Sequence, residues 1–264
     1  MRRTALAALC IAAAATAGLT ACQSDQDKAD SRTNTSSTSA TPGKSAAKKE
    51  PFAGLTGGQI ADRATKATTG ASSLRMKGDI PDDESGGTVS LDVLLNKKGE
   101  CAGTIRMGGK GKADLIKAGD VVYMKFDEAL LREQGEGESK ADTDAVVAML
   151  AGKWTKSKAT GANAKEFEDF CDLGTVLEGA ADTNSDASRG KTATVDGAPA
   201  ITLHEKDGKD RYTLYVATEG KPYLLRVDST AGADQGSITF SDFDKPVPTQ
   251  KPAGDILDLD ALGG

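Results

Sequence analysis

The chain has 264 residues and a formal net charge of −6, because 39 acidic residues outnumber 33 basic ones. This acidic balance argues against nucleic-acid binding, which needs a basic patch, and against electrostatic adhesion to anionic membrane surfaces. Aromatic residues make up only 4% of the chain. The length still allows one sizeable hydrophobic core, so a single domain is expected.

The N-terminus has the succession of regions that is typical of a bacterial lipoprotein signal peptide. Two arginines precede an Ala-rich apolar run over residues 6–19 that is too short for a membrane span. The stretch Leu-Thr-Ala-Cys at residues 19–22 follows and reads as a lipobox. We therefore predict a signal peptide over residues 1–21 and a diacylglyceryl anchor on Cys22. The alternatives are an ordinary signal peptide or an uncleaved anchor that happens to contain a cysteine.

The predicted mature chain divides into a tether and a domain. Cleavage removes both N-terminal arginines and changes the formal charge from −6 to −8. Residues 22–50 have almost no apolar side chains, which predicts a disordered tether with a reach of roughly 30 Å. The folded domain is expected over residues 51–264. These features predict a protein anchored through Cys22 to the extracytoplasmic face of the cell membrane.

Two cysteines remain in the predicted domain, Cys101 and Cys171. Disulfides persist in an extracytoplasmic compartment, so we predict that these two pair. They lie 70 positions apart, and closing such a loop is worth about 4 kcal/mol in the chain-entropy model. The alternative is two unpaired buried thiols. No metal is expected, because two cysteines and one histidine, widely separated, lack the spacing of a ligand set.

The domain begins with a helix signal and continues with strand signals. Thr56 and Gln59 form the pattern of a capping box, which predicts a helix to about residue 69. Period-two alternation between Gly-rich turns then predicts an antiparallel meander. Its strands are expected over residues 72–79, 87–96, 101–107, 112–117 and 121–126.

Helices are predicted in the middle of the domain and strands again in its last third. The expected helices cover residues 127–134, 142–150 and 165–181, with Asp142 or Thr143 capping the second. The expected strands cover residues 191–196, 200–206, 211–218, 221–229 and 236–243. Strands, then helices, then strands predict an α+β fold with one large curled antiparallel sheet and helices on its concave face. Such a sheet encloses either a filled core or a cavity.

No catalytic arrangement is found. The chain has no Gly-x-Ser-x-Gly elbow and no phosphate-binding glycine loop. His204 follows the apolar Leu203 in a predicted strand, where successive side chains point to opposite faces, so we expect His204 to face solvent. Asp182-x-Asn184-x-Asp186 opens like a calcium loop, but alanines stand where its later glycine and glutamate belong. Trp154 is interpreted as a core residue. We expect no enzyme activity and no cofactor.

The order of the elements resembles a known family. The carrying motifs are Gly-Asp-Val-Val-Tyr-Met-Lys at residues 119–125, Lys-Trp-Thr at 153–155 and Val-Asp-Gly-Ala-Pro-Ala at 195–200. The chain resembles actinobacterial lipoproteins of the LppX/LprG type, whose fold is related to the lipoprotein carrier LolA, and its composition resembles a Streptomyces-like secreted protein. The resemblance implies a half-open antiparallel barrel with helices at its mouth, an apolar cavity for acyl chains, and no catalytic residues.

The leading hypothesis is therefore a membrane-anchored lipoprotein that carries an acyl lipid or glycolipid, or another lipoprotein, without covalent chemistry. It is expected to act as a monomer. The alternative hypothesis is a cell-surface protein-interaction module with a filled core and no ligand cavity; an enzyme is the third. The candidate residues of the lipid cavity are Leu91, Val93, Val122, Met124, Leu214 and Leu225.

Overall fold

The computed structural model describes residues 50–82, 87–159, 162–178, 186–230 and 235–262. The predicted signal peptide, Cys22 and the tether up to residue 49 lie outside these residues, as do Asp182 and Asn184 of the calcium-like stretch. The described residues form an α+β domain with five helices and one sheet of twelve strands. The helices are α1 (Gly57–Thr69), α2 (Glu128–Gln134), α3 (Lys140–Leu150), α4 (Ala162–Cys171) and α5 (Leu173–Glu178).

Ten of the twelve strands match the predicted strands to within a few residues, whereas β6 and β12 were not among the predicted ones. The first meander contains β1 (Ser73–Asp82), β2 (Gly87–Asn96), β3 (Cys101–Met107), β4 (Gly111–Ala118), β5 (Val121–Phe126) and β6 (Trp154–Lys158). The second contains β7 (Ser188–Val195), β8 (Ala198–Asp207), β9 (Asp210–Ala217), β10 (Leu224–Ser229) and β11 (Gly236–Ser241). A short β12 (Ile256–Asp258) comes last.

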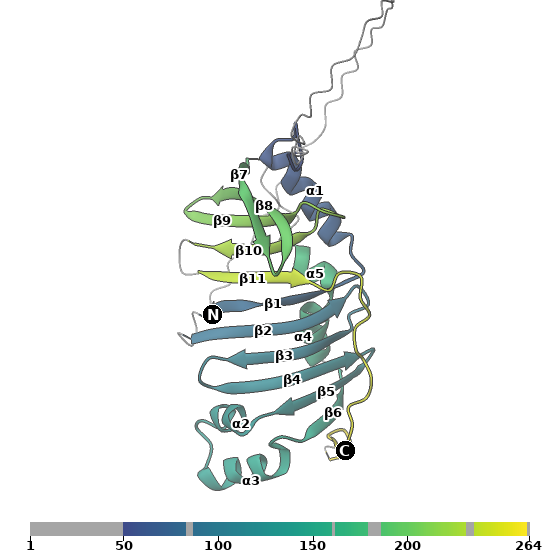
Figure 1. The fold of residues 1–264 in the computed structure, drawn as a ribbon. Helices are drawn as coiled ribbons and strands as arrows, with labels where there is room; N and C mark the ends of the chain where they lie inside the picture. Colours follow the sequence, from purple (N-terminus) through teal and green to yellow (C-terminus); the bar gives the residue numbers. More distant parts are fainter. Residues whose placement is uncertain (1–49, 83–86, 160–161, 179–185, 231–234, 263–264) are drawn as a thin grey trace, which may run out of the picture. The chain divides into compact units, whose positions relative to one another are not determined.

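The two meanders form one curled, unclosed sheet. Its strand order is β12-β6-β5-β4-β3-β2-β1-β11-β10-β9-β8-β7, so the first and last strands of the two meanders meet at β1 and β11 (Figure 1). Every neighbouring pair is antiparallel except β12 and β6. In Figure 1, α4 and α5 lie behind the sheet, on its concave side. The predicted α+β half-barrel is confirmed.

Helix α1 begins and ends as the sequence predicts. Thr56 is its N-cap, and the Thr56 hydroxyl accepts from the Gln59 N–H while the Gln59 side chain accepts from the Thr56 N–H. The capping box therefore satisfies two of the free N–H groups at the helix start. The buried face carries small residues beside Ile60, so the helix lies close to the sheet. Gly70 is the C-cap.

The segment before α1 is held by a single arginine of β7. The Arg189 guanidinium donates to the carbonyls of Pro51 and Phe52, both at 2.8 Å, and to that of Leu55 at 3.0 Å. It also pairs with the Glu50 carboxylate at 3.0 Å. A planar guanidinium has five N–H donors in a fixed fork, which suits it to gather several acceptors of one loop. This clasp fixes where the chain enters the domain.

The prediction of one helix over residues 165–181 is wrong. Helix α4 ends at Cys171 and α5 begins at Leu173. Between them, Asp172 forms a parallel bridge with Asn96, and the Asp172 carboxylate accepts from the Thr175 N–H at 2.8 Å. A side chain that caps a new helix start ends the preceding one, because the capping residue takes extended dihedrals.

Helix α3 also starts earlier than predicted. Its N-cap is Ser139, whose hydroxyl accepts from the Asp142 N–H, instead of Asp142 or Thr143.

The C-terminal segment closes one edge of the sheet. It runs from β11 to β6, where β12 adds three residues in parallel and Asp258 pairs with Lys156 at 2.8 Å (Figure 1). Near its start, the Asp244 carboxylate accepts hydrogen bonds from the Ser72 N–H, the Tyr223 hydroxyl and Lys221. The Ser72 N–H is the largest cause of a pKa for Asp244 well below its ordinary value. A covered edge strand offers fewer free backbone groups to other chains.

The core lies between the concave face of the sheet and helices α1, α4 and α5. Cys101 of β3 and Cys171 of α4 form a disulfide, and both are fully buried. The predicted disulfide is thus present, and it ties the first meander to the helices. The fully buried core residues with large side chains are Ile60, Leu74, Val93, Leu95, Leu115, Val122, Leu173, Leu203 and Val216.

Candidate functional site

Burial falls off from one end to the other along several strands of the concave face. On β2, Leu95 and Val93 are 1% exposed and Leu91 is 9% exposed, whereas Val89 is only half-buried. All four side chains lie on the same face, because alternate residues of a strand share a face. The packed core therefore ends partway along β2, and the apolar alternation continues beyond it.

Neighbouring strands repeat this gradient. On β3, Cys101 is fully buried while Ile105 is half-buried and Met107 is 40% exposed. On β9, Val216 is fully buried while Tyr212 is half-buried. The strand registers place the incompletely covered residues of these and other strands at the same end of the concave face. We call them the apolar floor: Ile80, Val89, Ile105, Met107, Phe126, Tyr212, Val227 and Ile238.

One part of the apolar floor is hollowed. A groove of about 200 Å³ is lined by apolar side chains that include Ile80, Tyr212, Val227 and Ile238. A cavity of about 150 Å³ with apolar walls is known to take up a molecule as large as benzene. The groove therefore has room for a short stretch of hydrocarbon chain.

The wall of the same groove also includes the polar residues Asp79, Ser229 and Ser237. The Ser229 hydroxyl, buried and on β10, has no hydrogen-bond partner among the described residues. Because an unsatisfied buried hydroxyl costs free energy, a ligand oxygen or N–H that reached it would be favoured.

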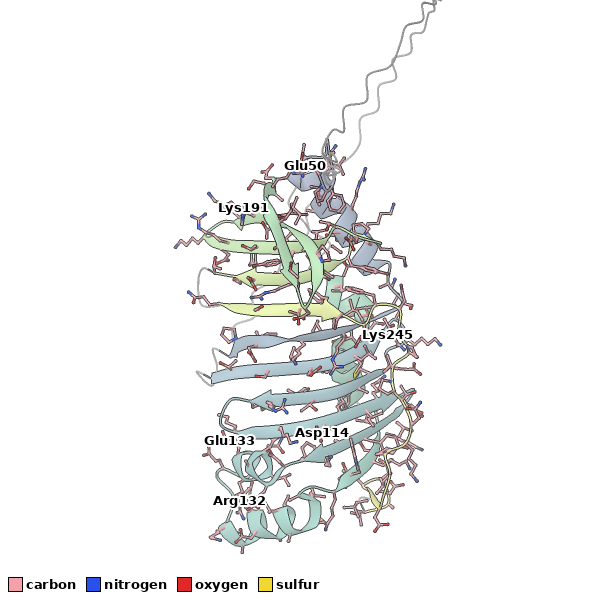
Figure 2. All side chains as sticks on the ribbon, viewed as in Figure 1. Glu50, Asp114, Arg132, Glu133, Lys191 and Lys245 are labelled. Carbon is pink, nitrogen blue, oxygen red and sulfur yellow. A yellow bond between two sulfur atoms is a disulfide. The ribbon has the colours of Figure 1, made fainter. Side chains whose placement is uncertain are left out.

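The convex face is polar by contrast. Asp114, labelled in Figure 2, accepts from the Thr104 hydroxyl at 2.8 Å and pairs with Lys125 at 3.0 Å. Burial tends to raise the pKa of Asp114, but these two donors outweigh it and hold the pKa below its ordinary value. Arg75 and Asp92 form a similar cross-strand pair. Ion pairs between neighbouring strands make this face polar. The apolar floor is therefore confined to the concave side.

The structure places five of the six candidate cavity residues on the concave face. Val93 and Val122 are 1% exposed and lie in the packed core. Leu91 and Leu214 lie at the boundary of that core, and Met124 is half-buried beside it. Leu225 lies at a β-bulge between Leu224 and Arg226 and is not part of the core cluster.

None of the six candidate cavity residues belongs to the apolar floor, although both sets lie in the same alternating runs. The residues of the apolar floor differ from the core residues in being incompletely buried, and their burial depends on how far the helices extend over the sheet.

Two other residues of interest lie elsewhere. Trp154 faces the convex side opposite Lys125, whose ammonium is 4.9 Å from the ring centroid, so its interpretation as a core residue is wrong. His204 is exposed, as predicted, and its Nδ1 lies 3.4 Å from the Thr213 hydroxyl. Within the described ranges, no group of three or more His, Cys, Asp or Glu residues is arranged to hold a metal ion. No helix among the described residues is long and apolar enough to cross a membrane.

Comparison with solved structures decides the fold. LprF from Mycobacterium bovis aligns over 75% of this chain and 97% of its own, with a TM-score of 0.52 and 15% sequence identity. The chain has the fold of LprF. The lipoprotein LppX from Mycobacterium tuberculosis aligns over 72% of this chain and 97% of its own, with a TM-score of 0.44 and 17% identity. The likeness to LprF confirms the fold that was predicted from the resemblance.

No protein-family model matches the chain, and no curated protein matches it. The likeness therefore concerns the LolA-like fold, and the function has to be argued from this chain's own residues.

Proposed function

We propose that this protein is a lipid-binding lipoprotein of the cell envelope, which holds acyl chains non-covalently on the apolar floor. The observation that carries the proposal is the burial gradient of the concave face, which leaves incompletely covered apolar residues beside a closed core. Soluble proteins rarely leave a large apolar patch without a partner for it. The LolA-like fold and the resemblance to LppX/LprG-type lipoproteins support the same function.

The size of the groove bears on the kind of ligand. Each buried methylene contributes about 0.8 kcal/mol, so roughly eight methylenes in the groove contribute about 6 kcal/mol. Association costs at least about 4 kcal/mol in lost translational and rotational freedom. A single short chain in the groove of about 200 Å³ would therefore bind weakly. We infer that a lipid with two or more chains, which also covers the floor of β2 to β5, is the preferred cargo.

The same proposal places the domain at the membrane through Cys22. A diacylglyceryl cysteine supplies the two chains that stable anchoring requires. The tether over residues 22–50 leads to the Arg189 clasp, which fixes its point of entry. No step of this function involves a covalent change, so we propose that the protein acts as a carrier and not as an enzyme. We propose further that it acts as a monomer.

A binding titration with matched variants tests the proposal. The full chain with Cys22→Ser is titrated with a fluorescent fatty acid. Ile238→Asp places a charge on the apolar floor, whereas Thr239→Asp places the same charge on the convex face of the same strand. We expect Ile238→Asp to weaken binding at least tenfold and Thr239→Asp to leave it within twofold. Equal affinities in both variants would contradict the proposed site. Absence of binding to any acyl ligand would favour an interaction module with a filled core.

A further inference from the structure

Lys117 is a buried cation that the acyl-binding proposal does not use. It lies near the end of β4 on the concave face, opposite Cys101 in register, and is 5% exposed. Its ammonium donates to the Gly99 carbonyl, in the β2–β3 turn, at 2.7 Å. An ammonium has three N–H donors. The described residues give Lys117 this one acceptor, and none of the ion pairs they form includes it.

A buried charge of this kind calls for a counter-ion. Burying an ammonium is costly unless it is paired and hydrogen-bonded, and one neutral carbonyl supplies only part of the compensation. Because two donors remain, the ammonium of Lys117 is arranged to bind a further acceptor.

The space for such an acceptor adjoins Lys117. A pocket of about 550 Å³ lies between the β2–β3 and β4–β5 turns and the helices α4 and α5. Lys97 and Lys98 also line it, and no ion pair among the described residues includes either. The apolar floor lies at the opposite end of the strands, with the packed core between the two. This pocket is therefore separate from the proposed acyl site.

Three carboxylates line the same pocket and limit the charge of its ligand. Asp172 is engaged, since it accepts from both the N–H and the hydroxyl of Thr175. Asp120 and Asp169 line the pocket without an ion pair among the described residues. Their charges disfavour a phosphate monoester, which carries a charge of about −1.5 to −2 at neutral pH.

We propose that this pocket binds a singly charged oxyanion, of the phosphodiester or carboxylate kind, with the ammonium of Lys117 as its buried partner. Lys97 and Lys98 contact the anion from the pocket mouth. The phosphodiester of an anionic lipid headgroup and a free small anion share this chemistry.

The test uses the full chain with Cys22→Ser at constant ionic strength. Dimethyl phosphate and acetate are titrated calorimetrically, and phosphatidylglycerol vesicles are tested by co-sedimentation. Binding of the small anions identifies a site for free anions, whereas binding to vesicles alone identifies a headgroup site. In either case Lys117→Met is expected to weaken binding at least tenfold, and the control Lys209→Met, in the exposed β8–β9 turn, to leave it unchanged.

A second variant decides the matter if Lys117→Met does not fold. The double variant Lys97→Gln/Lys98→Gln changes exposed side chains only, and we expect it to weaken binding two- to fivefold. The proposal is overturned if none of the three probes binds saturably. It is also overturned if Lys117→Met, or in its place the double variant, binds like the unmodified chain.

Discussion

The two ends of the concave face should respond differently to the same substitution. Val93 and Val89 lie on the same face of β2, four residues apart, but Val93 is 1% exposed and Val89 is half-buried. Val93→Ala removes two buried methyl groups worth about 0.8 kcal/mol each and leaves a cavity, for a total of about 2–3 kcal/mol. Val89→Ala leaves no closed cavity and should cost about 0.5–1 kcal/mol. The loss of strand propensity is common to both variants and cancels.

Thermal and urea unfolding followed by circular dichroism measure this difference. In a domain of this size, 1 kcal/mol corresponds to a change of about 2–4 °C in melting temperature. We therefore expect Val93→Ala to lower the melting temperature by about 4–12 °C and Val89→Ala by about 1–4 °C. Equal losses at the two positions would show that the core extends over the apolar floor, and the reasoning would be refuted.

Ligand gives the same pair a second readout. A ligand that binds only the folded state raises its stability in proportion to the logarithm of ligand concentration over Kd. We expect an acyl ligand to stabilise Val93→Ala as much as the unmodified chain and to stabilise Val89→Ala less.

Three further predictions concern contacts outside the floor. Replacing Cys101 and Cys171 with alanine should lower the free energy of unfolding by about 4 kcal/mol. Reductant should lower the stability of the unmodified chain and leave that of the alanine variant unchanged. Asp244→Asn should destabilise the domain most at pH values above the ordinary carboxyl pKa of 3.8, and the penalty should shrink as the pH falls toward the lowered folded pKa; a penalty that grew in acid would contradict this sign. Arg189→Gln should speed hydrogen exchange at the Leu55 amide, because that amide donates to the Phe52 carbonyl, which Arg189 also binds; exchange at an unchanged rate would show that the clasp is not needed.

Much of the sheet could be predicted because local signals are strong there. Strands β2, β3 and β5 have the predicted bounds, because period-two alternation ends at Gly-containing turns after β2 and β3 and at the helix N-cap Asp127 after β5. The capping box of Thr56 and Gln59 likewise located α1. The break between α4 and α5 was missed, although the sequence Asp172-Leu173-Gly174 carries a capping residue and a helix-weakening glycine. The bridge from Asp172 to Asn96 joins distant segments and has no local signal.

The site was less predictable than the fold for a physical reason. The alternation of apolar and polar residues shows which face of a strand a residue occupies. In this respect Val93 and Val89 are equivalent. Whether a helix covers that residue depends on where α4 and α5 end and how they pack. The sequence thus predicted an apolar concave face, while the distinction between its closed core and its exposed floor required the structure. The pairing of β12 with β6 is non-local in the same way.

Native mass spectrometry tests the central claim most directly. The full chain with Cys22→Ser would be secreted by a lipid-rich bacterial host, purified without detergent, weighed intact and extracted with solvent. We predict a co-purifying lipid with two or more acyl chains at about one per protein, lost on denaturation and absent from the Ile238→Asp variant. A protein that carries no lipid, and remains empty after incubation with diacyl and triacyl lipids, would contradict the account and identify the concave face as a surface for a protein partner.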